Sequence, residues 1–255
     1  MPGNDTRDFD ASDVPAAIGL LTRLPVKVDM DKAQQRGARA AWAYPLAGLV
    51  IAVFAGLLAE VLLRLGTPAP LVAALVLGLS VVLTGAMHED GLADSADGLW
   101  GGWTRERRLE IMKDSHIGAY GVIALVLGLL IRWAALSMVI EGHLWLALVI
   151  SAVLSRAGMT ALMAWLPNAR VGGLSHSVGR PQLVHAVVAG VIAVGIAFAL
   201  APGLAPVLSL LTAATVLGCA LVAKAKINGQ TGDILGATQQ LSEIVVLIGL
   251  ATLLA

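Results

Sequence analysis

Long apolar segments recur along the whole chain, and they constrain its fold more than any other feature. A run of about 20 apolar residues can cross the roughly 30 Å hydrocarbon core of a bilayer as a helix. Hydrophobic residues make up 58% of the chain and charged residues only 13%, against roughly 25% charged in an average soluble domain. We therefore predict one integral membrane domain over residues 1–255, an all-α, polytopic bundle of about seven transmembrane helices at residues 41–63, 71–87, 119–140, 144–166, 183–201, 207–223 and 238–255.

The connections between these segments alternate between tight turns and long polar loops at residues 88–118, 167–182 and 224–237. This alternation places the long loops and residues 1–39 on one side of the membrane. Lys and Arg accumulate on the cytoplasmic side, and Arg64 is the one basic residue on the opposite side. The long-loop side carries Arg7, Arg23, Lys27, Lys32, Arg36, Arg39, Arg105, Arg107, Arg108, Lys113, Arg170, Arg180, Lys224 and Lys226. The long loops are therefore predicted to face the cytoplasm.

Residues 1–39 contain charges of both signs and no uninterrupted apolar core, so they do not resemble a cleavable signal peptide. Within them, residues 14–26 mix apolar side chains with Arg23, which favours a segment at the membrane interface, with an ordinary polar tail as the alternative. The formal net charge of zero gives no reason to expect a nucleic-acid partner. Membrane lipid is the expected surrounding, and an oligomer is compatible with the sequence.

The richest polar segment, His88 to Gly98, packs four carboxylates into nine positions at a membrane boundary. If it is helical, Asp90, Asp94 and Asp97 share one face because their spacing is i, i+4, i+7. Carboxylates at this density repel one another unless a cation neutralises them, and oxygen ligands suit Mg²⁺, Mn²⁺ or Ca²⁺. A solvated acidic loop is the alternative. His88 is either functional or a hydrogen-bonded boundary residue.

Three further polar stretches have the composition of phosphate-binding loops. Basic and hydroxyl-bearing side chains follow the acidic segment, and the next two loops combine glycines with an arginine or an aspartate. The candidates for contact with substrate phosphates are Lys113, Asp114, Ser115, Asn168, Arg170 and Arg180. Asp233 opens the last helix, either as a site carboxylate or as a helix N-cap.

Two arginines lie inside predicted membrane helices, where a charge is costly and usually marks a function or an internal partner. Arg156 is the better functional candidate and is included among the predicted substrate-binding residues. Arg132 is equally well explained by a carboxylate partner inside the bundle.

At these motifs the chain resembles the cobalamin synthase family. The resemblance covers residues 21–26, residues 88–98, residues 108–118 and the segment Thr231-Gly232-Asp233 with Gly236-Ala237. Ser95 stands where the family often has threonine, and His116 stands where arginine is frequent. The resemblance implies transfer of the adenosylcobinamide phosphate group from adenosylcobinamide-GDP to α-ribazole or its 5′-phosphate, with release of GMP and a requirement for Mg²⁺.

We expect a catalytic metal site in which carboxylates from two distant segments meet. The predicted catalytic residues are Asp90, Asp94, Asp97 and Asp233, and the predicted Mg²⁺ ligands are these four with Glu89 and Glu243 as outer members. A metal suits cleavage of a diphosphate with a nucleotide leaving group. The alternatives are a lipid enzyme resembling CDP-alcohol phosphotransferases and, from another class, a cation-coupled transporter.

Overall fold

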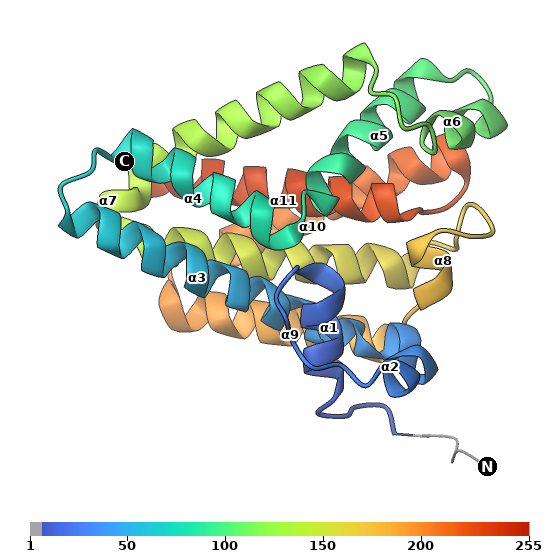
Figure 1. Ribbon diagram of the computed structural model, residues 1–255, viewed down its shortest axis with the longest axis horizontal. Coiled ribbons are helices and arrows are strands. Elements are labelled where there is room, and N and C mark those ends of the chain that lie inside the picture. Colours follow the sequence, from blue (N-terminus) through green and yellow to red (C-terminus); the bar gives the residue numbers. More distant parts are fainter. Residues whose placement is uncertain (1–6, 255) are drawn as a thin grey trace.

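Helices account for most of residues 7–254, the part of the chain that this computed structural model describes (Figure 1). The elements are α1 (Asp13–Leu21), α2 (Met30–Arg36), the 3₁₀ helix η1 (Gly37–Ala43), α3 (Tyr44–Arg64), α4 (Ala69–Thr84), α5 (Met87–Gly101), α6 (Arg105–Ile111), α7 (Ala119–Trp165), α8 (Leu174–Val178), α9 (Leu183–Leu200), α10 (Ala205–Ile227) and α11 (Gly232–Leu254). No β-strand occurs within this range. The prediction of an all-α membrane helix bundle is confirmed.

Five helices in the described range are long and apolar enough to cross a membrane, or six if α4 and α5 together form one bent span. The predicted count of about seven treated α7 as two spans. The structure has one 47-residue helix with a break at His143, where φ is −136° and ψ is 31°. At about 1.5 Å per residue, an unbroken helix of this length would far exceed the bilayer thickness. The break lets the second half run back alongside the bundle (Figure 1).

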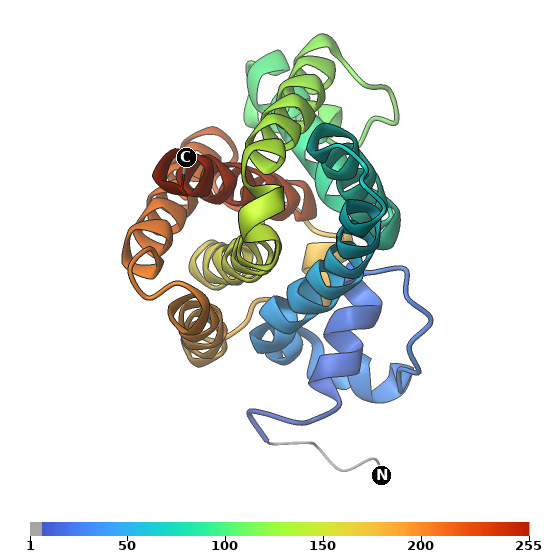
Figure 2. The ribbon, with the colours of Figure 1, turned by 90° about the vertical axis from the view of Figure 1, so that its left-hand side faces the viewer.

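The second half of α7 lies at the centre of the bundle, where α3, α9, α10 and α11 surround it (Figure 2). Small residues permit this close packing, as is usual between membrane helices. A Cβ on Gly48 of α3 would meet the Ala152 carbonyl oxygen of α7, and a Cβ on Gly158 would meet Val216 of α10. The central helix thereby fixes the positions of the helix ends from which the polar loops extend.

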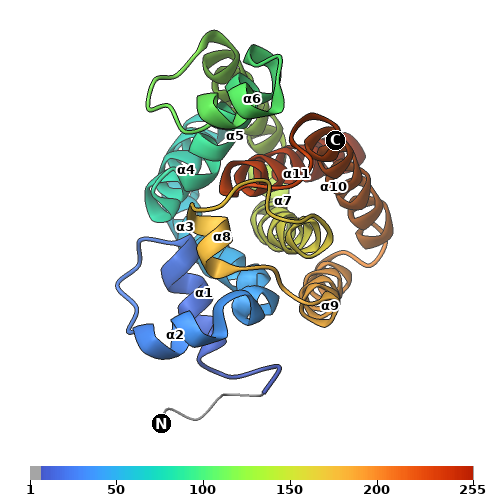
Figure 3. The ribbon, with the colours of Figure 1, turned by 90° about the vertical axis from the view of Figure 1, so that its right-hand side faces the viewer.

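The N-terminal segment folds against the end of the bundle that carries α6 and α8 (Figures 1 and 3). Buried Asp13 accepts hydrogen bonds from Arg36, at 2.8 Å from Nη2, and from the Trp42 indole at 2.7 Å. Burial opposes ionisation of Asp13, but these hydrogen bonds outweigh it and hold its pKa below the ordinary value. Residues 14–26 are therefore part of a packed substructure, and the alternative of an ordinary polar tail is wrong.

Candidate active site at one end of the bundle

The acidic motif forms a helix of its own, because α4 ends where two residues adopt left-handed conformations. Gly85 has φ 63° and Ala86 has φ 58°, and α5 leaves at 88° to α4. A Cβ on Gly85 would meet the Arg23 side chain, so glycine is needed at this corner. The predicted apolar segment 71–87 extended the straight helix past this bend, and that boundary was wrong. The bend directs α5 across the bundle against α11 and α7.

Close backbone packing brings the start of α11 to the acidic helix. A Cβ on Gly91 of α5 would collide with the backbone of Asp233, and a Cβ on Gly236 would meet the backbone of His88. The charges of Asp90, Asp97 and Asp233 consequently act on the Asp94 carboxylate, opposed by the charge of Arg170. The structure thus brings together the four carboxylates that the sequence predicts to form one site.

Asp233 is not isolated within this cluster, because it is hydrogen-bonded by neighbours from two loops. Its Oδ2 accepts from Arg170 Nη2 at 3.1 Å and from Thr231 Oγ1 at 3.0 Å. Asp90 is exposed and Asp94 is half-buried, and within the described range neither side chain makes a hydrogen bond or ion pair. Asp90 and Asp94 are therefore the two carboxylates free to bind a cation or accept a proton.

Asp97 has a structural role that the sequence did not reveal. Its Oδ2 accepts from the Gly118 N–H at 2.7 Å and its Oδ1 from the Gly121 N–H at 2.9 Å, at the first turn of α7. A carboxylate at a helix N-terminus satisfies free N–H groups and complements the helix dipole. A Cβ on either glycine would collide with the carboxylate, so both glycines are needed for this contact.

The donor set of the cluster suits a hard cation, and Mg²⁺ usually takes one or two carboxylates together with substrate phosphates and water. Asp90 and Asp94 fit that requirement because neither carboxylate is already used. Within residues 7–254, however, no three histidine, cysteine, aspartate or glutamate side chains converge to hold an ion. The residues thus fit a metal shared with the substrate better than one enclosed by protein ligands.

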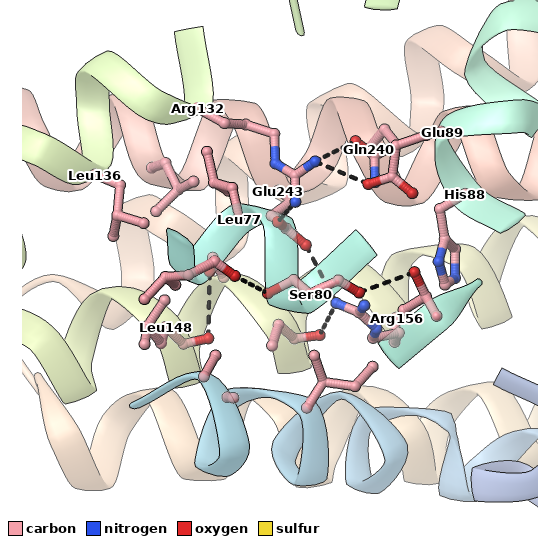
Figure 4. A pocket seen from close by; sticks show the side chains of 18 residues that line it. Leu77, Ser80, His88, Glu89, Arg132, Leu136, Leu148, Arg156, Gln240 and Glu243 are labelled. Atoms are coloured by element: carbon pink, nitrogen blue, oxygen red, sulfur yellow. Dashed lines mark hydrogen bonds and ion pairs between the residues drawn. The ribbon is translucent and has the colours of Figure 1, made fainter. Parts of the chain in front are cut away.

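Glu89 and Glu243, the predicted outer metal ligands, bind arginines inside the bundle (Figure 4). Arg132 donates to Glu89 Oε1 at 3.0 Å and to Glu243 Oε1 at 2.6 Å, and Arg156 donates to Glu243 Oε2 at 3.2 Å. Two positive and two negative groups thus balance, and the pairing predicted for Arg132 is confirmed. Gln240 completes the cluster with bonds to Arg132 and Glu89.

The buried cluster retains some unused hydrogen-bonding capacity. Within the described part of the chain, Nε of Arg132, Nε of Arg156 and both ring nitrogens of His88 are buried without a partner. They border a cavity of about 30 Å³, which has room for an ordered water. Arg156 is 3% exposed, so the structure places it in this interior cluster and away from the loops that carry the other predicted phosphate-binding residues.

The loop with Asn168 and Arg170 is joined to the start of α11 by backbone pairing. Ala169 N–H donates to the Gln230 carbonyl oxygen and Gln230 N–H to that of Pro167, both at 2.8 Å, and the Asn168 side chain accepts from Gln230. This pairing carries Arg170 to Asp233. By contrast, Arg180 donates to the Ala164 and Trp165 carbonyl oxygens, each at 2.8 Å, and so caps the end of α7.

The predicted phosphate-binding residues after α6 lie in an exposed loop. Lys113, Asp114 and Ser115 are all exposed. Asp114 Oδ1 lies 2.7 Å from His116 Nδ1 and also accepts from the His116 N–H, and these bonds hold the pKa of Asp114 below its ordinary value. Nearby, Arg108 donates to the Lys226 carbonyl oxygen at 3.0 Å, which ties this region to the end of α10.

A family model described as cobalamin-5-phosphate synthase matches residues 13–251. The chain belongs to this family. It is 44% identical over 252 residues to the adenosylcobinamide-GDP ribazoletransferase of Bradyrhizobium diazoefficiens, a match that covers 97% of this chain and 96% of the relative. The proteins of that name from Brucella ovis and Brucella anthropi are 40% and 41% identical, over 93% of this chain and 95% of each relative. No solved structure matches the chain.

Membership in the cobalamin-5-phosphate synthase family supports the first interpretation of the motifs over the CDP-alcohol phosphotransferase and transporter alternatives. Sequence reasoning missed three contributors to the site: Gly118, Gly121 and Gln240. Gly118 ends a motif that the resemblance covers, and Gly121 follows it by three residues. Their contacts with Asp97, however, join segments more than 20 residues apart. Gln240 could have been found from the sequence, because a polar residue three positions before Glu243 in an apolar helix indicates a buried polar contact.

Proposed function

We propose that this protein transfers the adenosylcobinamide phosphate group of adenosylcobinamide-GDP to ribazole or its 5′-phosphate and releases GMP. The observation that carries this proposal is the carboxylate cluster of α5 and Asp233, with Arg170 beside it, at one end of the membrane bundle. Cleavage of the diphosphate that joins cobinamide to guanosine requires charge neutralisation at phosphate and a base for the acceptor hydroxyl. The cluster contains residues suited to both tasks.

Mg²⁺ is the proposed cofactor, and Asp90 and Asp94 are the residues that would hold it. When bound, the ion supplies positive charge to phosphate oxygens. Asp233 is engaged by Arg170 and Thr231, and Asp97 by the first turn of α7, so these two shape the site and contribute negative charge. Glu89 and Glu243 hold α5, α7 and α11 together through Arg132.

The chain's own residues orient the two substrates. Arg170 lies at the edge of the cluster, where its guanidinium can contact a phosphate while keeping its bond to Asp233. Lys113 lies in the exposed loop before α7, and we propose that it contacts the nucleotide from the solvent side. The acceptor hydroxyl attacks the phosphorus on the cobinamide side and displaces GMP, which leaves with the bridging oxygen. The proton of the hydroxyl passes to a carboxylate oxygen of Asp94 that the ion does not occupy.

The site faces the cytoplasm, and the protein resides in the bacterial inner membrane. Fourteen of the seventeen basic residues lie in the N-terminal segment or the long loops, and positive charge is retained on the cytoplasmic side. The acidic cluster, α6, α8 and the N-terminal segment all lie towards the same end of the bundle (Figures 1 and 3). This side also gives access to nucleotide substrates.

The test is turnover by the purified protein in detergent or proteoliposomes. With adenosylcobinamide-GDP, ribazole and Mg²⁺, GMP and a cobamide are expected in equal amounts, and omission of ribazole should abolish both. Release of GMP that does not depend on ribazole would indicate hydrolysis instead of transfer. Absence of any GMP from folded protein with both substrates present would overturn the proposal.

A further inference from the structure

A large hollow lies beneath the N-terminal segment, outside the acidic cluster. Its volume is about 640 Å³ and its walls come from α1, α2, η1, α8 and the extended stretch between α1 and α2. Small-molecule sites typically have volumes of about 300–1,000 Å³. The hollow includes Leu24 and Val26, which belong to the motif of residues 21–26 that the proposed catalytic chemistry leaves without a role.

The walls of this hollow are held in place by specific contacts. The Arg23 N–H donates to the Leu83 carbonyl oxygen at 2.7 Å, which fastens the motif to the end of α4. Gly37 has φ 50°, and a Cβ there would collide with the carbonyl oxygen of Val178 in α8. The Asp13–Arg36 pair joins α1 to α2. These contacts hold the walls together, because they join the motif to α4, η1 to α8 and α1 to α2.

The hollow leads towards the acidic cluster. A second cavity, of about 50 Å³, shares Leu20, Tyr44 and Val178 with the first. The second cavity is also lined by His88, which begins the acidic motif, and by Gly232, which precedes Asp233. Helix α8 contacts both η1, which lines the hollow, and α11. The hollow is thus next to the two segments that carry the acidic motif and Asp233.

The chemistry of the lining selects among the groups that the two substrates carry. Of the described residues around the hollow, none is charged, and the polar side chains are those of Gln34, Tyr44 and Ser177. A guanine base carries several donors and acceptors that would lose their water partners here. The base of ribazole is a flat benzimidazole with two methyl groups and one free ring nitrogen. An apolar wall with few hydrogen-bonding groups suits this base.

We infer that the hollow under α1 and α2 binds the dimethylbenzimidazole base of the acceptor nucleoside and directs its ribose past Tyr44 towards Asp94. This inference rests on the proposed function, because that function supplies the acceptor. It gives the N-terminal segment a role in selecting the acceptor, separate from the chemistry at phosphate.

The test narrows the hollow from two sides and compares it with a matched surface change. Ala33→Leu on α2 and Ala16→Leu on α1 each place a larger side chain among the lining residues. Gln35→Leu adds the same side chain at an exposed position of α2 that does not line the hollow. Equilibrium binding of ribazole is measured by calorimetry, and the KM values for both substrates are measured by GMP release.

Both narrowing variants should weaken ribazole binding at least tenfold and raise its KM in parallel, whereas the KM for adenosylcobinamide-GDP stays within twofold of wild type. Gln35→Leu should leave all three quantities within twofold. The unmethylated benzimidazole nucleoside should lose less affinity than ribazole in the narrowed variants, because it occupies less of the hollow. This pattern depends on the base and would not arise from general damage to the fold.

Failure of this inference is distinguishable from failure of the proposed function. If wild type turns over but the narrowed variants bind ribazole normally, or lose affinity equally for both substrates, the base site is overturned and the transferase stands. If ribazole binding weakens as expected but wild type never releases GMP, the base site stands and the proposed reaction fails. Absence of both ribazole binding and turnover in wild type overturns both.

Discussion

Replacing Arg132 with methionine tests whether the buried charge cluster holds the acidic helix in place. Arg132 is 2% exposed and bonds Glu89, Gln240 and Glu243 at 3.0, 2.9 and 2.6 Å, and so joins α5 to α11 from α7. Its removal leaves two buried carboxylates with Arg156 as the one remaining arginine of the cluster. Breaking a buried pair from one side typically costs about 3–5 kcal/mol, and we expect a loss of that size in the free energy of unfolding.

The assay is reversible unfolding in mixed micelles, followed by tryptophan fluorescence. Arg64→Met is the matched control. Arg64 pairs with Glu60 at 2.7 Å, but the two side chains are 77% and 37% exposed. Exposed pairs of this kind contribute about 0–1 kcal/mol. Adding Glu243→Gln to Arg132→Met should recover part of the loss, because charge balance with Glu89 and Arg156 is restored. A loss below about 1 kcal/mol in Arg132→Met would refute the reasoning.

Three further predictions follow from individual contacts. Asp97→Asn should destabilise the fold by about 1–3 kcal/mol, because an amide cannot accept from both N–H groups at the start of α7. Thermal unfolding measures this loss, and an unchanged stability would contradict the capping role of Asp97. Asp13→Asn should destabilise the protein by an amount that is constant near neutral pH. The folded-state pKa of Asp13 lies below the ordinary 3.8, so the stability that the ionised carboxylate contributes is present above that value and fades as pH falls through the lowered pKa. Unfolding curves of wild type and Asp13→Asn between pH 7 and pH 3 test this. A stability difference between the two proteins that grows towards low pH would contradict it. Arg170→Gln should raise the KM for adenosylcobinamide-GDP roughly tenfold or more. It should also lower the free energy of unfolding by about 1–3 kcal/mol, because Asp233 loses a charged partner. An unchanged KM would remove Arg170 from the phosphate site.

The helices could be predicted from the sequence because apolar length is a local property. Residues 41–63 and 183–201, for example, coincide closely with α3 and α9. The 88° bend could not be predicted, since it depends on left-handed conformations at Gly85 and Ala86 and on the distant Arg23 that packs there. Apolarity continues through the bend, so hydropathy alone does not mark it.

The candidate site was only partly accessible to sequence reasoning for a similar reason. The i, i+4, i+7 spacing was sufficient to place Asp90, Asp94 and Asp97 on one face. It could not show that Asp97 caps α7 or that Glu89 and Glu243 bind Arg132. Those roles depend on which helices are neighbours, and a carboxylate has the same local sequence signature whether its partner is a cation, an arginine or a backbone N–H.

The measurement that most directly tests the central claim is the turnover of Asp94→Asn. Asp94 lies among three other carboxylates and makes no hydrogen bond or ion pair with another described residue, so its neutral form should fold normally. We predict at least a hundredfold loss in kcat, equivalent to roughly 2.7 kcal/mol of transition-state stabilisation. We also predict a weaker apparent affinity for Mg²⁺ and an unchanged free energy of unfolding. The exposed control Asp8→Asn should match wild type in all three quantities. Near-normal Mg²⁺-dependent release of GMP by well-folded Asp94→Asn would contradict the assignment of the acidic face of α5 as the active site.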